Sequence, residues 1–308
     1  MQHSDDKLHP VAISQVMLNF ALRNGIDQQT CLLGTGISET ELSSGEGLVT
    51  RTQEMRLIEN LMLALPEVGV GGFELGLQYN LATFGVWGFA LRTCKTLRDA
   101  VALGLRYLPL STAYCRITVC EDGDAFGVIF DPDPIPPHLR QFLLERDMAT
   151  ALNLVREITF QGVEFRGVEF TGEPDVAASA IEALCGMAPA IHASANRILV
   201  NRAGASQPFP GYDPVLTRML EQQCQQRMDT VENSGLAGKV RQKLLGELGL
   251  GATLHDMASE LALSTRSLRR KLEQEGTSYR DLVEEERRQL ALQLLDSTTM
   301  KIEELAAH

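Results

Sequence analysis

The feature that most constrains the fold is a pair of helical patterns near the C-terminus, separated by a very short stretch of chain. Apolar residues at three- and four-residue spacing place one face of the first helix toward a core: Leu254, Met257, Ala258 and Leu261. Thr253 precedes this face and Asp256 follows within one turn, as in a capping box at a helix start. Residues 261–263 leave room only for a tight turn before the second helix.

The second helix of the pair is basic. Ser264 offers its hydroxyl to the free N–H groups at the helix start, while Leu268 and Leu272 lie on the inner face. The other positions carry four cationic side chains: Arg266, Arg269, Arg270 and Lys271. A short helix, a tight turn and a second helix dense in guanidinium groups fit the major groove of DNA. A basic helix face is also often merely solvated, so the pair alone leaves both interpretations open.

The pattern extends beyond the pair. Gly276 ends the basic helix, and Ser278 with Asp281 starts a long helix with further apolar positions. Residues 300–307 then begin a second copy of the helix at residues 257–261. The C-terminal part therefore predicts one helix-turn-helix, a long linking helix and the opening of a second helix-turn-helix.

Two helix-turn-helix units joined by one long helix resemble the AraC/XylS family of bacterial transcription regulators, over roughly residues 237–308. The resemblance implies a double-stranded DNA partner, with Arg266, Arg269 and Arg270 as the base-reading side chains. The DNA-binding residues that it assigns lie on the second helix and its cap: Ser264, Arg266, Arg269, Arg270 and Lys271. Ala262 departs from the family pattern, which often has glycine in this turn.

The second helix-turn-helix is incomplete, because the chain stops at His308 before a second recognition helix. We expect residues after Ser297 to be loosely docked, and the chain to bind its operator much more weakly than a longer chain. Two functions fit these features. The first is a transcription regulator controlled by a small-molecule effector, and the alternative is a truncated regulator that dimerises with an intact relative as a decoy. Titrating both lengths against one operator at fixed salt would distinguish them.

The charge of the chain is unevenly distributed. The formal net charge is −12, yet residues 237–308 carry 11 Lys/Arg against 12 Asp/Glu, a net of −1. The remainder carries 17 against 28, a net of −11. Net charge bears on non-specific association rather than on fold. An acidic body attached to a basic reading helix should therefore weaken non-specific DNA binding.

The N-terminal part changes its hydrophobic period once. Helical spacing runs through residues 11–24, 50–65 and 97–108, after which residues 114–130 alternate around a glycine-containing turn, as in a hairpin. Helix and strand patterns then follow one another, with a linker expected at residues 230–238. The predicted fold is an α+β N-terminal effector domain, with helices and a small antiparallel sheet, followed by an all-α helix-turn-helix domain. We place the effector-binding and dimerisation domain at residues 1–230 and the AraC-type DNA-binding domain at residues 237–308.

Three N-terminal segments resemble the arabinose-binding-like domain of one branch of the AraC family: residues 13–16, 83–90 and 96–100. The resemblance implies an effector site and a dimer contact, without establishing a sugar ligand. Aromatic residues near the change from helix to sheet are the candidate effector-binding residues: Phe84, Trp87, Phe89, Tyr107 and Tyr114. Each of them also fits ordinary core packing.

No enzymatic chemistry is predicted. The sequence has no nucleophile elbow, no phosphate-binding lysine motif and no zinc-protease motif, so we assign no catalytic residue and no cofactor. The six cysteines and six histidines lack metal-ligand spacing, so we assign no metal site. No segment resembles a signal peptide or a membrane span, which predicts a cytoplasmic protein that does not bind membranes. The expected partners are double-stranded DNA, an unknown small-molecule effector and a second copy of the chain, with RNA polymerase as a further candidate.

Overall fold

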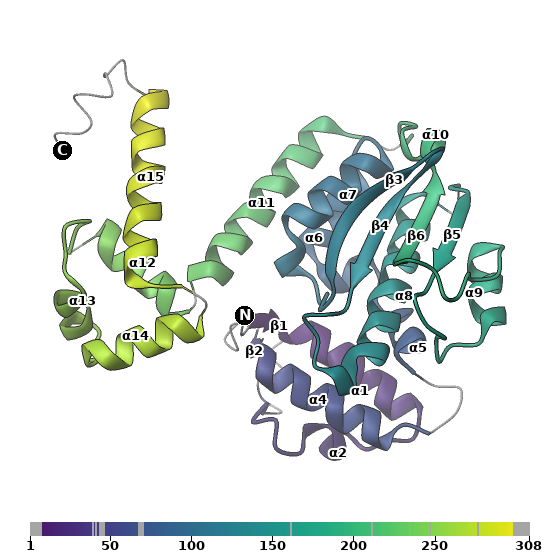
Figure 1. Cartoon of the computed structure of the whole chain (residues 1–308), viewed down its shortest axis with the longest axis horizontal. Coiled ribbons are helices and arrows are strands. Elements are labelled where there is room, and N and C mark those ends of the chain that lie inside the picture. The colour runs from purple at the N-terminus through teal and green to yellow at the C-terminus, as the bar shows by residue number, and fades with distance from the viewer. Residues whose placement is uncertain are drawn as a thin grey trace. The chain divides into compact units, whose positions relative to one another are not determined.

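The computed structural model divides the chain into two compact units (Figure 1). One unit spans His9–Met228 and the other begins at Asp229. The structure describes these residues: 8–38, 40, 42, 47–66, 71–160, 162–210, 212–233, 235–246, 248–275 and 277–297. Among them, no helix is both long and apolar enough to cross a membrane.

The first half of the larger unit is helical, as its sequence period predicts. Thr50 caps α4 through a reciprocal pair of hydrogen bonds with Gln53, at 3.2 Å and 2.9 Å, and Pro66 follows soon after the helix ends. The helices of this half are α1 (Val11–Arg23), α2 (Gln28–Leu32), α4 (Arg51–Ala64), α5 (Gly72–Gly76), α6 (Val86–Thr93) and α7 (Leu97–Arg106), with 3₁₀ turns η1 (Leu81–Phe84) and η2 (Leu108–Leu110). Short strands β1 (Leu8–Pro10) and β2 (Leu48–Thr50) pair beside them.

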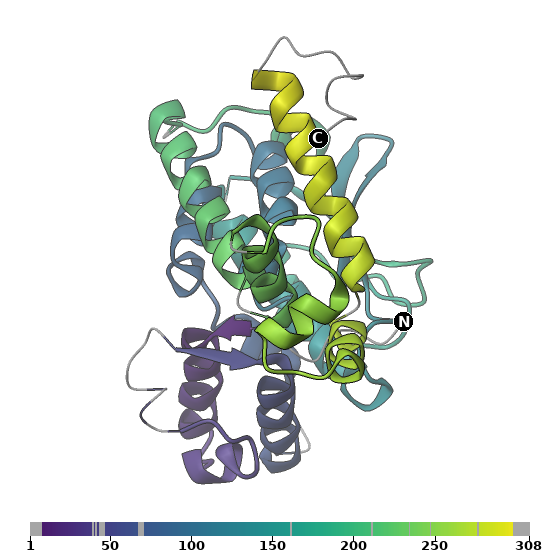
Figure 2. The same cartoon turned by 90° about the vertical axis from the view of Figure 1, so that its left-hand side faces the viewer.

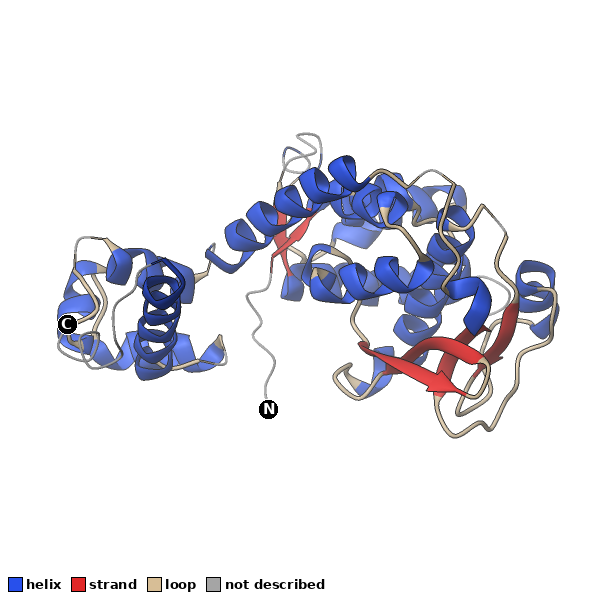
Figure 3. Ribbon diagram, turned by 90° about the horizontal axis from the view of Figure 1, so that it is seen from above, coloured by secondary structure: helices blue, strands red, loops and turns tan. Residues whose placement is uncertain are grey.

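The second half contains an antiparallel sheet with strand order β3-β4-β6-β5. The predicted hairpin forms, and its register pairs Asp122 with Ala125 across a tight turn in which Gly123 has φ +57°. Figure 3 shows the strands along one side of the unit, with helices on the other. The elements are β3 (Arg116–Asp122), β4 (Ala125–Asp131), η3 (Pro137–Leu139), α8 (Arg140–Ile158), β5 (Phe165–Glu169), α9 (Ala178–Cys185), β6 (Asn196–Asn201) and α10 (Arg202–Ala205).

Helices α5 and α8 approach each other at glycines. A Cβ added at Gly72 would lie 1.9 Å from the Phe142 carbonyl oxygen, and one at Gly76 would lie 2.4 Å from the Arg146 carbonyl oxygen. Thr150 Oγ1 donates to the Gly76 carbonyl at 3.1 Å, which ties the two backbones together. Most of α8 is buried, including three consecutive charged residues, Glu145, Arg146 and Asp147.

Helix α11 (Pro214–Asn233) is longer than the sequence pattern indicated, and α12 (Leu236–Leu245) begins soon after it. Most of the linker expected at residues 230–238 is therefore helical, although the two compact units divide close to it, between Met228 and Asp229. Residues 229–233 contain no glycine or proline to end the helix, so helical hydrogen bonding continues, and Gly235 is the described residue between the two helices.

The smaller unit is all-helical, with α12, α13 (Leu254–Glu260), α14 (Thr265–Gln274) and α15 (Tyr279–Ser297). Helix α15 continues without a break through its whole span (Figure 2). One apolar cluster holds the unit together: Val240, Leu244, Met257, Ala258, Leu268, Leu272 and Leu282. The predicted second helix-turn-helix falls on residues 298–308, outside the described residues. An α+β domain followed by a helical domain confirms the predicted fold class.

We expect the Gly76→Ala substitution to lower the free energy of unfolding by about 1–3 kcal/mol, because the added methyl overlaps the backbone of α8. Chemical denaturation of the whole chain measures the change. Gly172→Ala is the matched control, since a Cβ there has no atom within 4 Å. Equal effects of the two substitutions would contradict a rigid contact between α5 and α8.

Candidate DNA-binding helix and buried polar cluster

The helix-turn-helix forms as the sequence predicts. Thr253 Oγ1 accepts from Asp256 N at 3.2 Å, and the Asp256 carboxylate accepts from Thr253 N at 2.9 Å, which completes the capping box of α13. Leu263 N donates to the Ala258 carbonyl at 2.8 Å and closes the turn. Ser264 Oγ then accepts from Ser267 N at 3.1 Å and starts α14. Ser264 thus has a structural role as a helix cap in addition to its predicted place at the DNA-binding end.

Two leucines fix which face of α14 is exposed. Leu268 and Leu272 are fully buried in the apolar cluster of the unit. Residues three or four positions apart share a helix face, so the intervening side chains must point outward. The exposed side chains of this helix include all four predicted cations: Arg266, Arg269, Arg270 and Lys271.

The arginines outside α14 in this unit are already engaged. Arg241 pairs with Glu286 at 3.3 Å, and Arg287 donates to the Leu250 carbonyl at 2.8 Å. Two further arginines pair with glutamates one turn away on α15: Arg280 with Glu284 at 2.8 Å, and Arg288 with Glu285 at 2.7 Å. By contrast, no ion pair with a carboxylate forms, within the described part of the chain, at the four cations of α14: Arg266, Arg269, Arg270 and Lys271. Among the described residues of the unit, four of the cationic groups without an ion pair therefore lie on α14, beside Lys239 of α12 and Arg287, which bonds a neutral carbonyl.

The sequence did not predict the role of Glu275, which links two helices of this unit. Its two carboxylate oxygens accept from Leu236 N and Ala237 N, each at 2.7 Å, at the start of α12. A carboxylate at a helix N-terminus satisfies free N–H groups and complements the helix dipole. Glu275 lies directly after α14, so it joins the end of this helix to the start of α12. The contact spans 39 residues of sequence, and no local motif indicates it.

Ala262 occupies the left-handed region of the backbone, with φ +52°, where the family pattern favours glycine. The left-handed conformation costs an L-residue about 1–2 kcal/mol.

We expect Ala262→Gly to raise the free energy of unfolding by about 0.5–1 kcal/mol, because the greater entropy of unfolded glycine offsets part of the gain. Thermal and chemical denaturation measure the change. The control Ala258→Gly should lower stability, since Ala258 is buried within α13; a loss in both variants would refute strain at Ala262.

The five predicted aromatic residues do not gather at one point. Phe84 and Trp87 meet edge to face with ring centroids 5.2 Å apart, and Tyr79, which the prediction omitted, stacks on Phe84 at 6.0 Å. Phe89 is 50% exposed, on the outer face of α6. Tyr107 is buried and donates its hydroxyl to Gln225 of α11 at 3.2 Å. Of the five residues, the structure brings together Phe84 and Trp87, with Tyr79 beside them, and α6 turns Phe89 outward.

Tyr114 lies instead beside buried charged groups, which we call the buried polar cluster: His9, Glu54, Tyr114, Arg146 and Asp147. The Arg146 guanidinium carbon lies 5.0 Å from the centre of the Tyr114 ring. Burial would raise the pKa of the Glu54 carboxyl, but His9 and Arg146 more than offset it, so the pKa lies below its ordinary value. The cluster combines opposite charges away from water.

Arg146 and Asp147 form hydrogen bonds with each other and with the backbone just before β3. Arg146 Nη2 donates to Asp147 Oδ1 at 2.7 Å and to the Thr112 carbonyl at 2.5 Å. Asp147 Oδ2 accepts from the backbone N–H groups of Tyr114 and Cys115, each at 2.8 Å. These two side chains of α8 therefore hold the backbone that leads from the helical half into β3.

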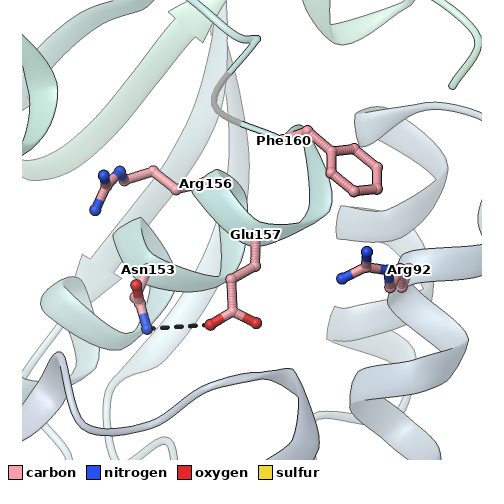
Figure 4. A pocket seen from close by; sticks show the side chains of 5 residues that line it. All are labelled: Arg92, Asn153, Arg156, Glu157 and Phe160. Carbon is pink, nitrogen blue, oxygen red and sulfur yellow. Dashed lines mark hydrogen bonds between the residues drawn. The ribbon is translucent and has the colours of Figure 1, made fainter.

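A surface hollow lies between α6 and the end of α8, but its polar groups diverge (Figure 4). Arg92 lies over the Phe160 ring at 4.7 Å, whereas Glu157 accepts from Asn153 Nδ2 at 3.4 Å. Figure 4 shows Arg156 pointing away from Arg92, so the two guanidinium groups do not converge on a common ligand. Within the described ranges of the chain, no group of three or more His, Cys, Asp or Glu side chains could hold a metal ion.

Comparison with known proteins shows which sequences and structures this chain is similar to. The model of the arabinose-binding domain of AraC transcription regulator, N-terminal, matches residues 25–209. An uncharacterized HTH-type transcriptional regulator of Mycobacterium tuberculosis is 30% identical over 303 residues, which cover 97% of this chain and 88% of that protein. The ornithine utilization regulator of Pseudomonas aeruginosa is 26% identical over 302 residues, with the same two shares. Among solved structures, the transcriptional regulator CdpR from Pseudomonas aeruginosa is 20% identical, with a TM-score of 0.47 over 96% of this chain and 89% of that one.

The helix-turn-helix and these relatives define a DNA-binding transcription regulator, and the names of the relatives describe regulators rather than enzymes. The chain belongs to the AraC family of transcription regulators, in the branch with the arabinose-binding N-terminal domain. Both resemblances predicted from the sequence are confirmed. The domain's name does not make arabinose the ligand of this chain.

Proposed function

We propose that this chain reads specific DNA sequences through α14 and that a small-molecule effector, bound by the N-terminal unit, controls this activity. The observation that carries the DNA-reading part is the contrast in charge pairing: the arginines of α14 are exposed and lack ion-pair partners among the described residues. The matched N-terminal domain supports the effector part. Arg266, Arg269 and Arg270 are the base-reading residues of this proposal.

Arginine suits this role because its guanidinium group donates two parallel hydrogen bonds to the O6 and N7 atoms of guanine. An arginine already paired with a glutamate would have to lose that partner first, so unpaired arginines bind with less competition. Lys271 and the N-terminal turn of α14 at Ser264 suit contacts to phosphates, because such contacts position a helix without reading sequence. We therefore assign base contacts to the arginines and backbone contacts to the other two residues.

We expect Arg269→Ala to weaken binding to a specific duplex about ten- to a hundredfold and to relax the base preference at one position. The duplex is one that the protein itself selects from random sequence, and binding is titrated at fixed salt. Arg288→Ala removes the same charge from an arginine paired with Glu285, so it is the matched control. Unchanged affinity and base preference in folded Arg269→Ala would refute the assignment.

We further propose that the chain forms a homodimer through the start of α11. Four apolar side chains are exposed in or just before its first turns: Tyr212, Val215, Leu216 and Met219. Val215 is 72% exposed and Met219 lies one turn further along, so both lie on one outward stripe. An exposed apolar stripe on a helix can pair with its own copy across a two-fold axis, which would double the DNA contacts of one chain.

Met219→Glu should raise the dissociation constant of such a dimer by about tenfold or more, because it places a carboxylate in an apolar interface. Sedimentation of the whole chain at several concentrations measures the constant. Gln222→Glu adds the same charge to an exposed polar position of α11 and should change it little. If the two variants sediment alike, α11 is not the dimer contact.

A further inference from the structure

Glu275 carries a carboxylate at the end of α14 where the helix itself disfavours one. Its backbone N–H donates to the Lys271 carbonyl at 3.1 Å, so the residue still belongs to the last turn of this helix. The C-terminal end of a helix carries partial negative charge, which favours cations there over carboxylates. An acidic side chain on a helix that contacts DNA also weakens the attraction to phosphates. Neither the helix nor the proposed DNA contact therefore explains why an acid lies here.

The carboxylate of Glu275 instead completes the start of α12. The residue before this helix is Gly235, which has no side chain with which to cap it. Glu275 supplies the acceptors in its place, since Oε1 accepts from Leu236 N and Oε2 accepts from Ala237 N, each at 2.7 Å. A carboxylate at the positive end of a helix satisfies free N–H groups and is favoured by the helix dipole. One side chain of α14 thus acts as the cap of α12.

Gly235 leaves room for this contact. A Cβ added at Gly235 would lie 3.1 Å from Glu275 Oε2 and 3.4 Å from Glu275 Cδ. The φ of Gly235 is −79°, which any L-residue adopts, so the backbone conformation does not require glycine. The missing side chain therefore matters for the approach of the carboxylate rather than for the turn.

The hydrogen bonds of Glu275 add direction to the apolar packing of α14. Among the described residues of this helix, Leu268 and Leu272 are the fully buried side chains, and they lie on one stripe. Leu236 and Ala237 of α12 pack against the same apolar cluster. Apolar packing is not directional, whereas hydrogen bonds weaken steeply when their distance or angle changes. The stripe therefore holds α14 on the core, and the contact with Glu275 restrains its end against rotation.

We propose that Glu275 is a positioning residue for DNA reading, because its two hydrogen bonds to α12 hold α14 in the orientation at which its arginines reach base edges. This inference rests on the proposed DNA reading by α14. Base contacts are hydrogen bonds of defined geometry, so they depend on the orientation of the helix that carries them. A change in that orientation displaces all of these arginines together. Glu275 itself acts through the helix and contacts no base.

The test compares Glu275→Ala with Glu273→Ala in the whole chain. Glu273 is an exposed acid of the same helix, so the two variants lose the same charge. Each is titrated at fixed salt against the duplex that the parent protein selects. By charge alone, the loss of a carboxylate should tighten DNA binding in both. We expect Glu273→Ala to bind as tightly as the parent or more tightly, and Glu275→Ala to bind about tenfold more weakly, the equivalent of one good base contact. Parental or tighter binding by folded Glu275→Ala would overturn the proposal.

The pattern of base preference separates positioning from stability. Binding is measured at a temperature at which thermal denaturation shows every variant to be folded. Arg269→Ala should relax the base preference at one position, whereas Glu275→Ala should relax it at several, because α14 moves as a whole. Weaker binding with an unchanged base preference would mean a purely structural role and would overturn the proposal. If Arg269→Ala is also without effect, the reading function of α14 fails as well; if only Glu275→Ala is without effect, the positioning role alone fails.

Gly235→Ala tests the same contact from the side of α12 and makes a smaller change than the loss of the carboxylate. The added methyl would displace the carboxylate, so DNA affinity should fall about threefold. In combination with Glu275→Ala it should cause no further loss, because no carboxylate remains to be displaced. Additive losses would show that the two residues act separately. Either that result or parental affinity in folded Gly235→Ala would contradict the proposal, even if Glu275→Ala does not fold.

Discussion

The N-terminal unit depends on the buried pair Arg146 and Asp147. These consecutive residues of α8 hold the Thr112 carbonyl and the backbone N–H groups of Tyr114 and Cys115. Residues 112–115 are the connection through which the helical half of the unit becomes the sheet. A buried ion pair gives little net stability by itself, because desolvation offsets the attraction between the charges. The hydrogen bonds of this pair instead fix where β3 begins relative to α8.

Much of the fold follows from local patterns in the sequence. The capping residues Thr50, Thr253 and Ser264 start their helices as expected, because a side-chain oxygen and the N–H groups of the next turn are close in sequence. Partners distant in sequence leave no such local signal. Glu275 reaches Leu236, and Arg146 reaches Thr112, only after the helices have packed. The candidate residues were therefore predicted in part: helical spacing predicted that the arginines of α14 are exposed, whereas no local pattern could indicate the buried charged residues of α8.

The two units differ in how their charged residues are distributed and paired. In the smaller unit, glutamates neutralise Arg241, Arg280 and Arg288 within the protein, whereas α14 keeps its positive charge exposed. A nearly neutral unit can thus present a strongly positive surface over one helix, while the excess of acidic residues lies elsewhere in the chain. Such an arrangement favours DNA contacts made through α14 over contacts made anywhere else on the surface.

Glu275 connects the end of α14 to the start of α12 within the smaller unit. The same carboxylate that follows α14 caps the first turn of α12, where the chain arrives from α11. These two hydrogen bonds act together with the packing of Leu236 and Ala237 against the apolar cluster, so the start of α12 is held by both. The C-terminal end of α14 is thus fastened to the start of α12, so the orientation of one helix constrains the orientation of the other.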